Sequence, residues 1–149
     1  MAQPRVKGCV TSGSLRSSAW PVFASLLIVF LSACGGGRVI SAGDVTVLVS
    51  ERPSGGMDAQ GGGRLEVVGG CLGASGSVIV WPHGTEVVDA DPLRIEVPDH
   101  GTFGLGQEVL VGGGYVLEHS AGEVEPGPFE VAGVTVPARC AEHDIFLAR

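Results

Sequence analysis

Acidic residues are absent from the first 33 residues of the chain, and lysine is absent from everything after Lys7. The first 33 residues therefore carry a charge of +3, whereas from Cys34 onward six arginines oppose all sixteen acidic residues, for a net charge of −10. A segment this acidic repels the phosphates of nucleic acids and the anionic head groups of lipids. The charge argues against a nucleic-acid partner and against attachment to a membrane through a basic surface.

Helix-forming patterns are also missing. No segment after Cys34 has apolar residues at the three- and four-residue intervals of an amphipathic helix, and the 25 glycines of the chain weaken helices. Valine dominates the aliphatic residues, and its β-branched side chain favours strands. At 149 residues the chain has room for one domain. The composition thus predicts a single all-β domain.

Aromatic residues make up only 5% of the chain, so few bulky side chains are available to fill a core. We expect those after Cys34 to be buried, with a surface cluster that marks a binding face as the alternative. They are Trp81, Phe103, Tyr115, Phe129 and Phe146.

The first 33 residues present basic, apolar and small residues in that order. Arg5, Lys7 and Arg16 come first, followed by a nearly unbroken apolar run over residues 20–31 and then by two small residues. The run is shorter than the roughly 20 residues that span a bilayer as a helix. This order is typical of a secretory signal peptide, which we expect to cover residues 1–33.

The end of this segment, Leu31-Ser32-Ala33-Cys34, resembles the lipobox of bacterial lipoprotein precursors. The resemblance covers only the signal segment and Cys34. It implies that the Cys34 thiol receives a diacylglyceryl group, that cleavage falls between Ala33 and Cys34, and that the new amino group can be acylated. It further implies that Cys9 leaves with the signal peptide. The mature chain would then be lipid-anchored at the extracytoplasmic face of a cell membrane or envelope.

Glycine-rich sequence separates this anchor from the expected domain. Gly35-Gly36-Gly37 is typical of a flexible tether, and residues 51–63 contain many strand breakers and no periodicity. We therefore expect residues 34–63 to be a lipidated N-terminus and tether with one strand, and residues 64–149 to be the β domain.

Within that domain, short β-branched runs alternate with turn residues. One run alternates strictly, with Leu93, Ile95 and Val97 on the same face. Strands at this near-regular spacing predict a small barrel of five to six strands similar to the OB type, and a β-sandwich is the alternative. The expected strands are 64–68, 77–81, 93–97, 108–111, 131–136 and 144–147.

Two cysteines remain once Cys9 and Cys34 are assigned. Because thiols outside the cytoplasm tend to be oxidised, we predict a disulfide between Cys71 and Cys140, with two separate buried thiols as the alternative. Closing a loop of this length stabilises a domain by about 4 kcal/mol in the chain-entropy model. Neither cysteine belongs to a CxxC pair, so no zinc site is predicted.

The four histidines lack the spacing of a metal site. His83 and His100 stand in Pro/Gly turns, and His143 lies between two acidic residues. We interpret these three and His119 as exposed turn residues. The alternative is a metal site gathered from distant loops, with Asp or Glu as further ligands.

Three further motifs do not complete a known site. Asp89-Ala-Asp91 is followed by Pro92 instead of the remaining ligands of a calcium loop. Gly73-Ala-Ser75-Gly-Ser77 lacks the last glycine of a nucleophile elbow and precedes a strand. Gly112-Gly113-Gly114 lacks the Lys-Ser/Thr of a phosphate loop and indicates a bulge or close backbone packing. We therefore predict no catalytic residue, no metal site and no cofactor.

Three functional hypotheses follow, in this order. The first is a non-enzymatic, membrane-anchored envelope lipoprotein whose β domain binds an envelope protein partner or has a structural role. The second is an extracytoplasmic module that binds a metal or a small ligand. The third is an enzyme of unfamiliar type, which requires a concave pocket with at least two convergent polar groups.

Overall fold

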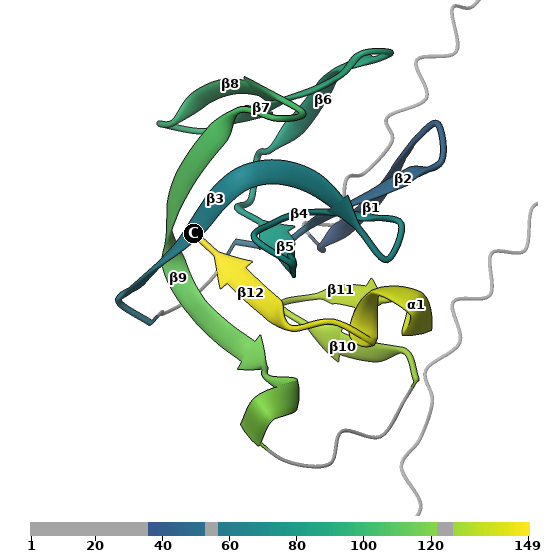
Figure 1. Cartoon of the computed structure of the whole chain (residues 1–149), viewed down its shortest axis with the longest axis vertical. Helices are drawn as coiled ribbons and strands as arrows, with labels where there is room; N and C mark the ends of the chain where they lie inside the picture. Colours follow the sequence, from purple (N-terminus) through teal and green to yellow (C-terminus); the bar gives the residue numbers. More distant parts are fainter. Residues whose placement is uncertain (1–35, 53–56, 122–126) are drawn as a thin grey trace, which may run out of the picture. The chain divides into compact units, whose positions relative to one another are not determined.

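The computed structural model describes residues 36–52, 57–121 and 127–149, and these described residues form one compact unit (Figure 1). The expected signal peptide and the cleavage site at Ala33 and Cys34 lie outside the described residues. In the described part of the chain, no helix is long and apolar enough to cross a membrane.

Strands dominate the described residues, so the all-β prediction is confirmed. The helical elements among them are one 3-10 turn, η1 (His119–Ala121), and one turn of α-helix, α1 (Ala138–Ala141). The strands are β1 (Arg38–Ala42), β2 (Val45–Val49), β3 (Ala59–Val68), β4 (Cys71–Ala74), β5 (Ser77–Trp81), β6 (Glu86–Ala90), β7 (Leu93–Val97), β8 (Gly101–Gly104), β9 (Glu108–Leu117), β10 (Phe129–Val131), β11 (Val134–Val136) and β12 (Ile145–Ala148).

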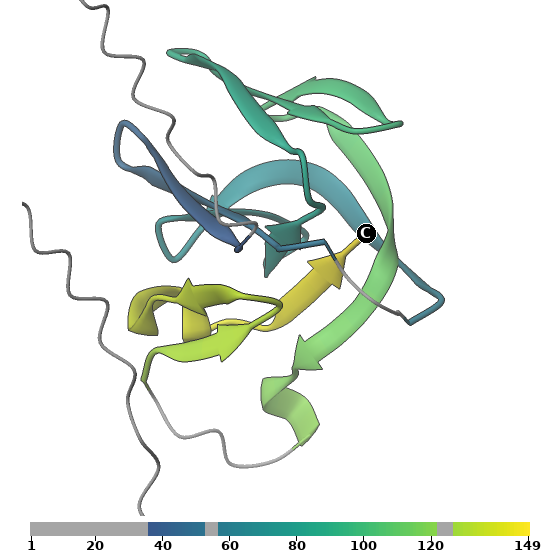
Figure 2. The same ribbon diagram turned by 180° about the vertical axis from the view of Figure 1, so that it is seen from behind.

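Six strands pair into a closed ring. In ring order they are β2, β4, β3, β9, β12 and β5, and β5 pairs again with β2. Strand β1 pairs with the outer edge of β2. The two long strands β3 and β9 curve past each other in Figures 1 and 2, and two smaller sheets, β6-β7-β8 and β10-β11, complete the fold.

Parallel pairing sets the geometry of one edge of this ring. Strand β5 runs parallel to both β2 and β12. Because these three strands point the same way, the residues that follow them lie at the same edge: Arg52 after β2, Pro82 and His83 after β5, and Arg149 after β12. That edge positions the candidate site.

The core lies on both faces of the central strands. The first apolar cluster contains Val47 and Val49 of β2 and Ile79 of β5. The second contains Leu48 of β2 and Val80 of β5, on the opposite face of the same strands. All five side chains are buried, and each contributes about 1.5–3 kcal/mol. A strand buried on both faces needs a continuous apolar run, which explains why these two segments do not alternate in sequence.

The outer sheets cover the two apolar clusters. Strand β7 adds Leu93, Ile95 and Val97 to the first cluster and turns its charged residues to solvent, which confirms the predicted alternation. The second cluster includes residues of β11 and α1. The ring is therefore filled by side chains and closed by the smaller elements.

The aromatic residues follow the expectation of a core role with one exception. Trp81 and Phe146 are the largest buried side chains, and Phe103 and Phe129 pack partly buried against the two clusters. Tyr115 is 44% exposed, with its ring edge-on to Phe146 at a centroid distance of 5.2 Å.

The folded unit begins before residue 64, where the sequence predicts the domain to start. Residues 38–49 form the β1–β2 hairpin, and residues 59–63 form the first half of β3. The reason is that β2 supplies central core residues and cannot be part of a tether. The expectation of a tether through residue 63 with a single strand is therefore corrected.

Glycines that resemble a linker in sequence line the place where β3 and β9 pack against β12. A Cβ atom on Gly61 would lie 2.5 Å from Cζ of Phe146, and one on Gly113 would lie 2.8 Å from its Cε1. Only glycine lets both backbones approach the ring this closely. The close backbone packing predicted for the glycines at 112–114 is thus confirmed at Gly113.

Candidate functional site

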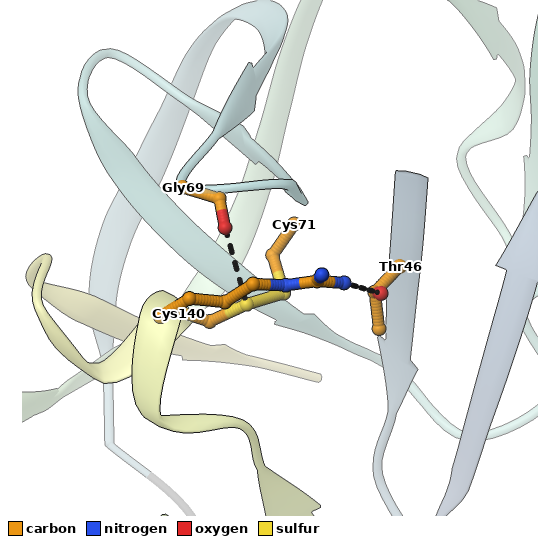
Figure 3. The surroundings of a disulfide bond; sticks show 5 residues. Thr46, Gly69, Cys71 and Cys140 are labelled. Atoms are coloured by element: carbon orange, nitrogen blue, oxygen red, sulfur yellow. Dashed lines mark hydrogen bonds between the residues drawn. A yellow bond between two sulfur atoms is a disulfide. The ribbon is translucent and has the colours of Figure 1, made fainter. Parts of the chain in front are cut away.

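The predicted disulfide between Cys71 and Cys140 is present, so this prediction is confirmed (Figure 3). Cys71 begins β4 and Cys140 lies in α1, their Cα atoms are 5.9 Å apart, and both residues are buried. Next to the bond, Nη2 of Arg139 donates a hydrogen bond to Oγ1 of Thr46 over 2.7 Å. Together the two links join α1 to β4 and β2.

The surroundings of the bond are those of a structural disulfide. The Cys140 sulfur lies 3.8 Å from the carbonyl oxygen of Gly69, a contact that becomes a hydrogen bond only when the sulfur carries a proton in the reduced state (Figure 3). Gly69 and Gly70 form a turn with φ of 55° and 79°, and a Cβ on Gly69 would lie 2.5 Å from the Arg139 carbonyl oxygen. Tight packing of this kind leaves the sulfur atoms inaccessible.

The structure separates the four histidines into two regions. His119 lies beside Asp144, whose Oδ1 accepts hydrogen bonds from the His119 backbone N–H over 2.8 Å and from its Nδ1 over 3.1 Å. The backbone hydrogen bond is the main reason that the pKa of Asp144 lies below its usual value, and the nearby His119 and His143 side chains add to the effect. His83 and His100 lie elsewhere, at the edge that follows the parallel strands.

Metal-ligand geometry does not occur in the described ranges, where no group of three or more His, Cys, Asp and Glu side chains could hold an ion. Asp89 and Asp91 instead form a turn, in which Oδ1 of Asp89 accepts a hydrogen bond from the Asp91 backbone N–H over 3.1 Å. Ser75 and Gly76 form the tight turn between β4 and β5, with positive φ at both residues. These motifs have a local structural role.

A charged hollow of about 300 Å³ lies at the edge after the parallel strands. We define the charged hollow by its lining residues, which are Arg52, Pro82, His83, Pro98, Asp99, His100 and Arg149. Two arginines and two histidines converge there, although the chain as a whole is acidic. Such a lining is suited to an anion, because guanidinium groups bind phosphates and carboxylates with two parallel hydrogen bonds.

Hydrogen bonds fix several groups of the charged hollow. His100 Nδ1 lies 2.9 Å from the Pro98 carbonyl oxygen, and because a carbonyl only accepts, Nδ1 carries the proton and Nε2 remains available. Asp99 adopts the left-handed conformation with φ of 62°. Arg149 forms an ion pair with Asp58 at 2.8 Å and also donates to the carbonyl oxygen of Met57.

Two buried polar atoms flank the turn that leads into the charged hollow. Trp81 Nε1 and Thr85 Oγ1 have no hydrogen-bond partner among the described residues, although both residues are fully buried. Leaving such a group unpaired costs about 1–3 kcal/mol. A buried polar group without a protein partner either binds an ordered water molecule or belongs to a site with a functional role.

A second hollow, the glycine groove, follows β3 and β9 and has a volume of about 530 Å³. It is lined by Gln60, Gly61, Gly62, Gly63, Glu108, Val109, Leu110 and Tyr115. Leu110 is 58% exposed at its rim, and Glu108 forms an exposed 3.8 Å ion pair with Arg64. The groove is larger than the charged hollow, but its backbone floor offers few polar side chains that could orient a ligand.

The charged hollow is therefore the better candidate for a ligand site. Neither His83 nor His100 was expected to lie in a hollow, and Arg52 and Arg149 were not singled out in the sequence. The only sequence signal for the charged hollow is that the turns at 82–84 and 98–101 both contain proline, histidine and glycine. This similarity does not show that the two turns line the same hollow. No known family model matches the chain, and no curated protein or solved structure is significantly similar to it.

Proposed function

We propose that the chain is the precursor of a lipid-anchored envelope protein whose β domain has a non-enzymatic binding or structural role on the extracytoplasmic side of a membrane. The observation that carries the proposal is Cys34, which follows Leu31-Ser32-Ala33 at the end of an apolar run with basic residues before it. The resemblance of Leu31-Ser32-Ala33-Cys34 to a lipobox supports acylation of the Cys34 thiol.

The acidic charge argues against attachment through a basic surface and in favour of a lipid anchor. A domain with a net charge of −10 is repelled by anionic bilayers. Each buried methylene group of an acyl chain contributes about 0.8 kcal/mol, and two chains hold a protein stably where one is marginal. A diacylglyceryl group on Cys34 would therefore outweigh the repulsion.

The Cys71–Cys140 disulfide supports an oxidising compartment, because such bonds are rare in reducing cytoplasm.

A second candidate function, an extracytoplasmic small-ligand-binding module, is favoured by the charged hollow. Arg52, His83 and His100 suit a small anion better than a metal ion, since no group of three or more His, Cys, Asp and Glu side chains among the described residues could hold a metal. Titration of the purified protein with inorganic phosphate and with small dicarboxylates tests this function. Saturable binding that is lost in Arg52→Ala supports it, and no heat or chemical-shift change at millimolar ligand removes it.

The lipid anchor is tested by mass spectrometry of the protein extracted from membranes and by partition into detergent. We expect the mature chain to begin at a diacylated Cys34 and to enter the detergent phase. Cys34→Ala should remain unprocessed and lose the lipid mass, whereas Cys9→Ala is the matched control and should behave like the parent. A Cys34→Ala protein that is still cleaved after Ala33 and still partitions into detergent contradicts the proposal.

A further inference from the structure

The distance between the proposed anchor and the folded domain is short. Gly36 is exposed, but Gly37 already packs on the fold, because a Cβ there would lie 2.6 Å from the Gly133 carbonyl oxygen and 2.9 Å from Cβ of Val134. Three Cα–Cα steps of about 3.8 Å join Cys34 to Gly37, so the lipidated residue lies within about 11 Å of Gly37. Gly37, the last residue of the expected Gly35-Gly36-Gly37 tether, therefore belongs to the folded domain.

A tether this short restricts the orientation of the domain. A domain of roughly 100 residues has a radius of gyration of about 13 Å, which exceeds the reach of the tether. The domain therefore cannot turn its far side to the bilayer without moving the anchor out of it. The end of the fold around Gly37 must stay close to the membrane surface.

The charged hollow lies at this same end. Glu51 contacts Gly133, where a Cβ would lie 2.6 Å from Cδ of Glu51, and the Glu51 backbone N–H donates to the Ala132 carbonyl oxygen over 2.8 Å. Arg52, the next residue, lines the charged hollow. Arg38, the residue after Gly37, donates from Nη2 to the carbonyl oxygen of Thr85 over 3.1 Å, in the turn that also carries His83.

The acidic excess of the domain lies mostly away from this end. Three arginines are gathered here, which are Arg38, Arg52 and Arg149. The acidic residues at the same end are Glu51, Asp58, Glu86, its cross-strand partner Glu96, and Asp99, so three positive charges meet five negative ones and this end carries −2 of the net charge of −10. Lipid phosphates therefore meet less repulsion at this end than from the rest of the domain.

We infer that the lipid anchor holds the Gly37 end of the domain against the bilayer, so that the charged hollow contacts the phosphate groups of phospholipid head groups. Arg52 supplies the guanidinium group for a phosphate, and His100 lines the same hollow, where the Pro98 carbonyl oxygen holds its Nδ1. This inference rests on the proposed function, because it requires a lipid on Cys34.

The test compares two exposed turn residues at opposite ends of the fold. Asp44 lies in the β1–β2 turn, and the register that pairs Arg38 with Val49 and Ala42 with Val45 puts this turn far from Gly37. The photo-cross-linker p-benzoylphenylalanine is placed at His100 or at Asp44 in the full-length protein. Each protein is purified from membranes, reconstituted in phospholipid vesicles and irradiated, and covalently attached phospholipid is measured by mass spectrometry.

We expect several-fold more attached phospholipid at position 100 than at position 44. A further variant carries about 20 Gly/Ser residues between Gly36 and Gly37, a flexible segment with a mean span of about 25 Å, and should bring the two yields together. Equal yields at both positions with the native tether, in protein shown by its mass to be lipidated, overturn the inference and leave the proposed function intact. Protein without lipid on Cys34 overturns both.

Discussion

The ring of Phe146 occupies the space that a side chain on Gly61 would need. Three ring atoms lie within 2.8 Å of the position of a Cβ on Gly61, and Phe146 itself is only 2% exposed. On another side the ring meets Tyr115 edge-on. One aromatic residue of β12 therefore fills the ring of strands between the glycine segments of β3 and β9.

Replacing Gly61 by alanine should destabilise the domain by about 1–3 kcal/mol, because overpacking forces the backbone or the Phe146 ring to shift. Gly112→Ala is the matched control on the opposing strand, since nothing lies within 4 Å of a Cβ there. Urea denaturation followed by tryptophan fluorescence measures both, because Trp81 is buried in the same cluster. Equal midpoints for the two variants would contradict this packing.

Removal of the disulfide tests how much the bond contributes to the free energy of unfolding. The bond links residues 69 positions apart, and the chain-entropy model gives about 4 kcal/mol for its loss. We expect the double variant Cys71→Ala, Cys140→Ala to show a lower free energy of unfolding by about 2–5 kcal/mol. A double variant as stable as the parent would show that packing of α1 holds the fold without the bond.

The parts of the fold that the sequence predicts well are those where burial alone dictates the residues. Residues 77–81 and 93–97 coincide with β5 and β7, because one is apolar throughout and the other alternates strictly. Strands β4, β6 and β8 were not expected, because β4 and β8 have only four residues and contain glycine, and β6 is almost wholly exposed and does not alternate between apolar and polar residues. The run 131–136 is two strands, since Ala132 and Gly133 adopt positive φ and form a turn.

The candidate site was beyond sequence reasoning for a different reason. The charged hollow depends on parallel pairing of β5 with β2 and β12, and such pairing joins segments far apart in the chain. Periodicity predicts that a strand is buried, but it does not say which strand lies next to it. The Cys71–Cys140 bond was predictable because these two cysteines are the only ones left once Cys9 is assigned to the signal peptide and Cys34 to the lipid anchor.

Stability in acid should depend on Asp144. Its pKa is lowered in the folded protein, chiefly because the His119 backbone N–H donates to it, so the carboxylate form is favoured by folding. The resulting stabilisation is fully present above the ordinary value of 3.8 and is lost as pH falls through the lower folded pKa. We expect Asp144→Asn to remove this part of the pH dependence, which lies below the ordinary value of 3.8. The effect should be small, because the pair is more than a third exposed.

A companion variant separates the backbone and side-chain contributions to that pKa. His119→Ala keeps the backbone N–H that Asp144 Oδ1 accepts but removes the ring, so the pKa of Asp144 should rise only part of the way to its ordinary value. An NMR titration of the Asp144 carboxyl carbon in the parent protein and in His119→Ala measures the change in its pKa. A pKa at the ordinary value in His119→Ala would show that the ring, not the backbone, lowers it.

The contact between Gly37 and the β10–β11 turn can be tested without any lipid. Gly37→Ala places a methyl group 2.6 Å from the Gly133 carbonyl oxygen, and since this oxygen belongs to the backbone, the N-terminal segment must move away. We expect a stability loss of about 1 kcal/mol, the lower end for overpacking, because a terminal segment yields more easily than a core. Amide hydrogen exchange should accelerate at Glu51, whose N–H donates to the Ala132 carbonyl oxygen next to this contact. Gly36→Ala is the matched control, with nothing within 4 Å of its Cβ. Unchanged exchange in Gly37→Ala would mean that the tether extends beyond Gly37, and the restricted orientation of the domain would lose its physical basis.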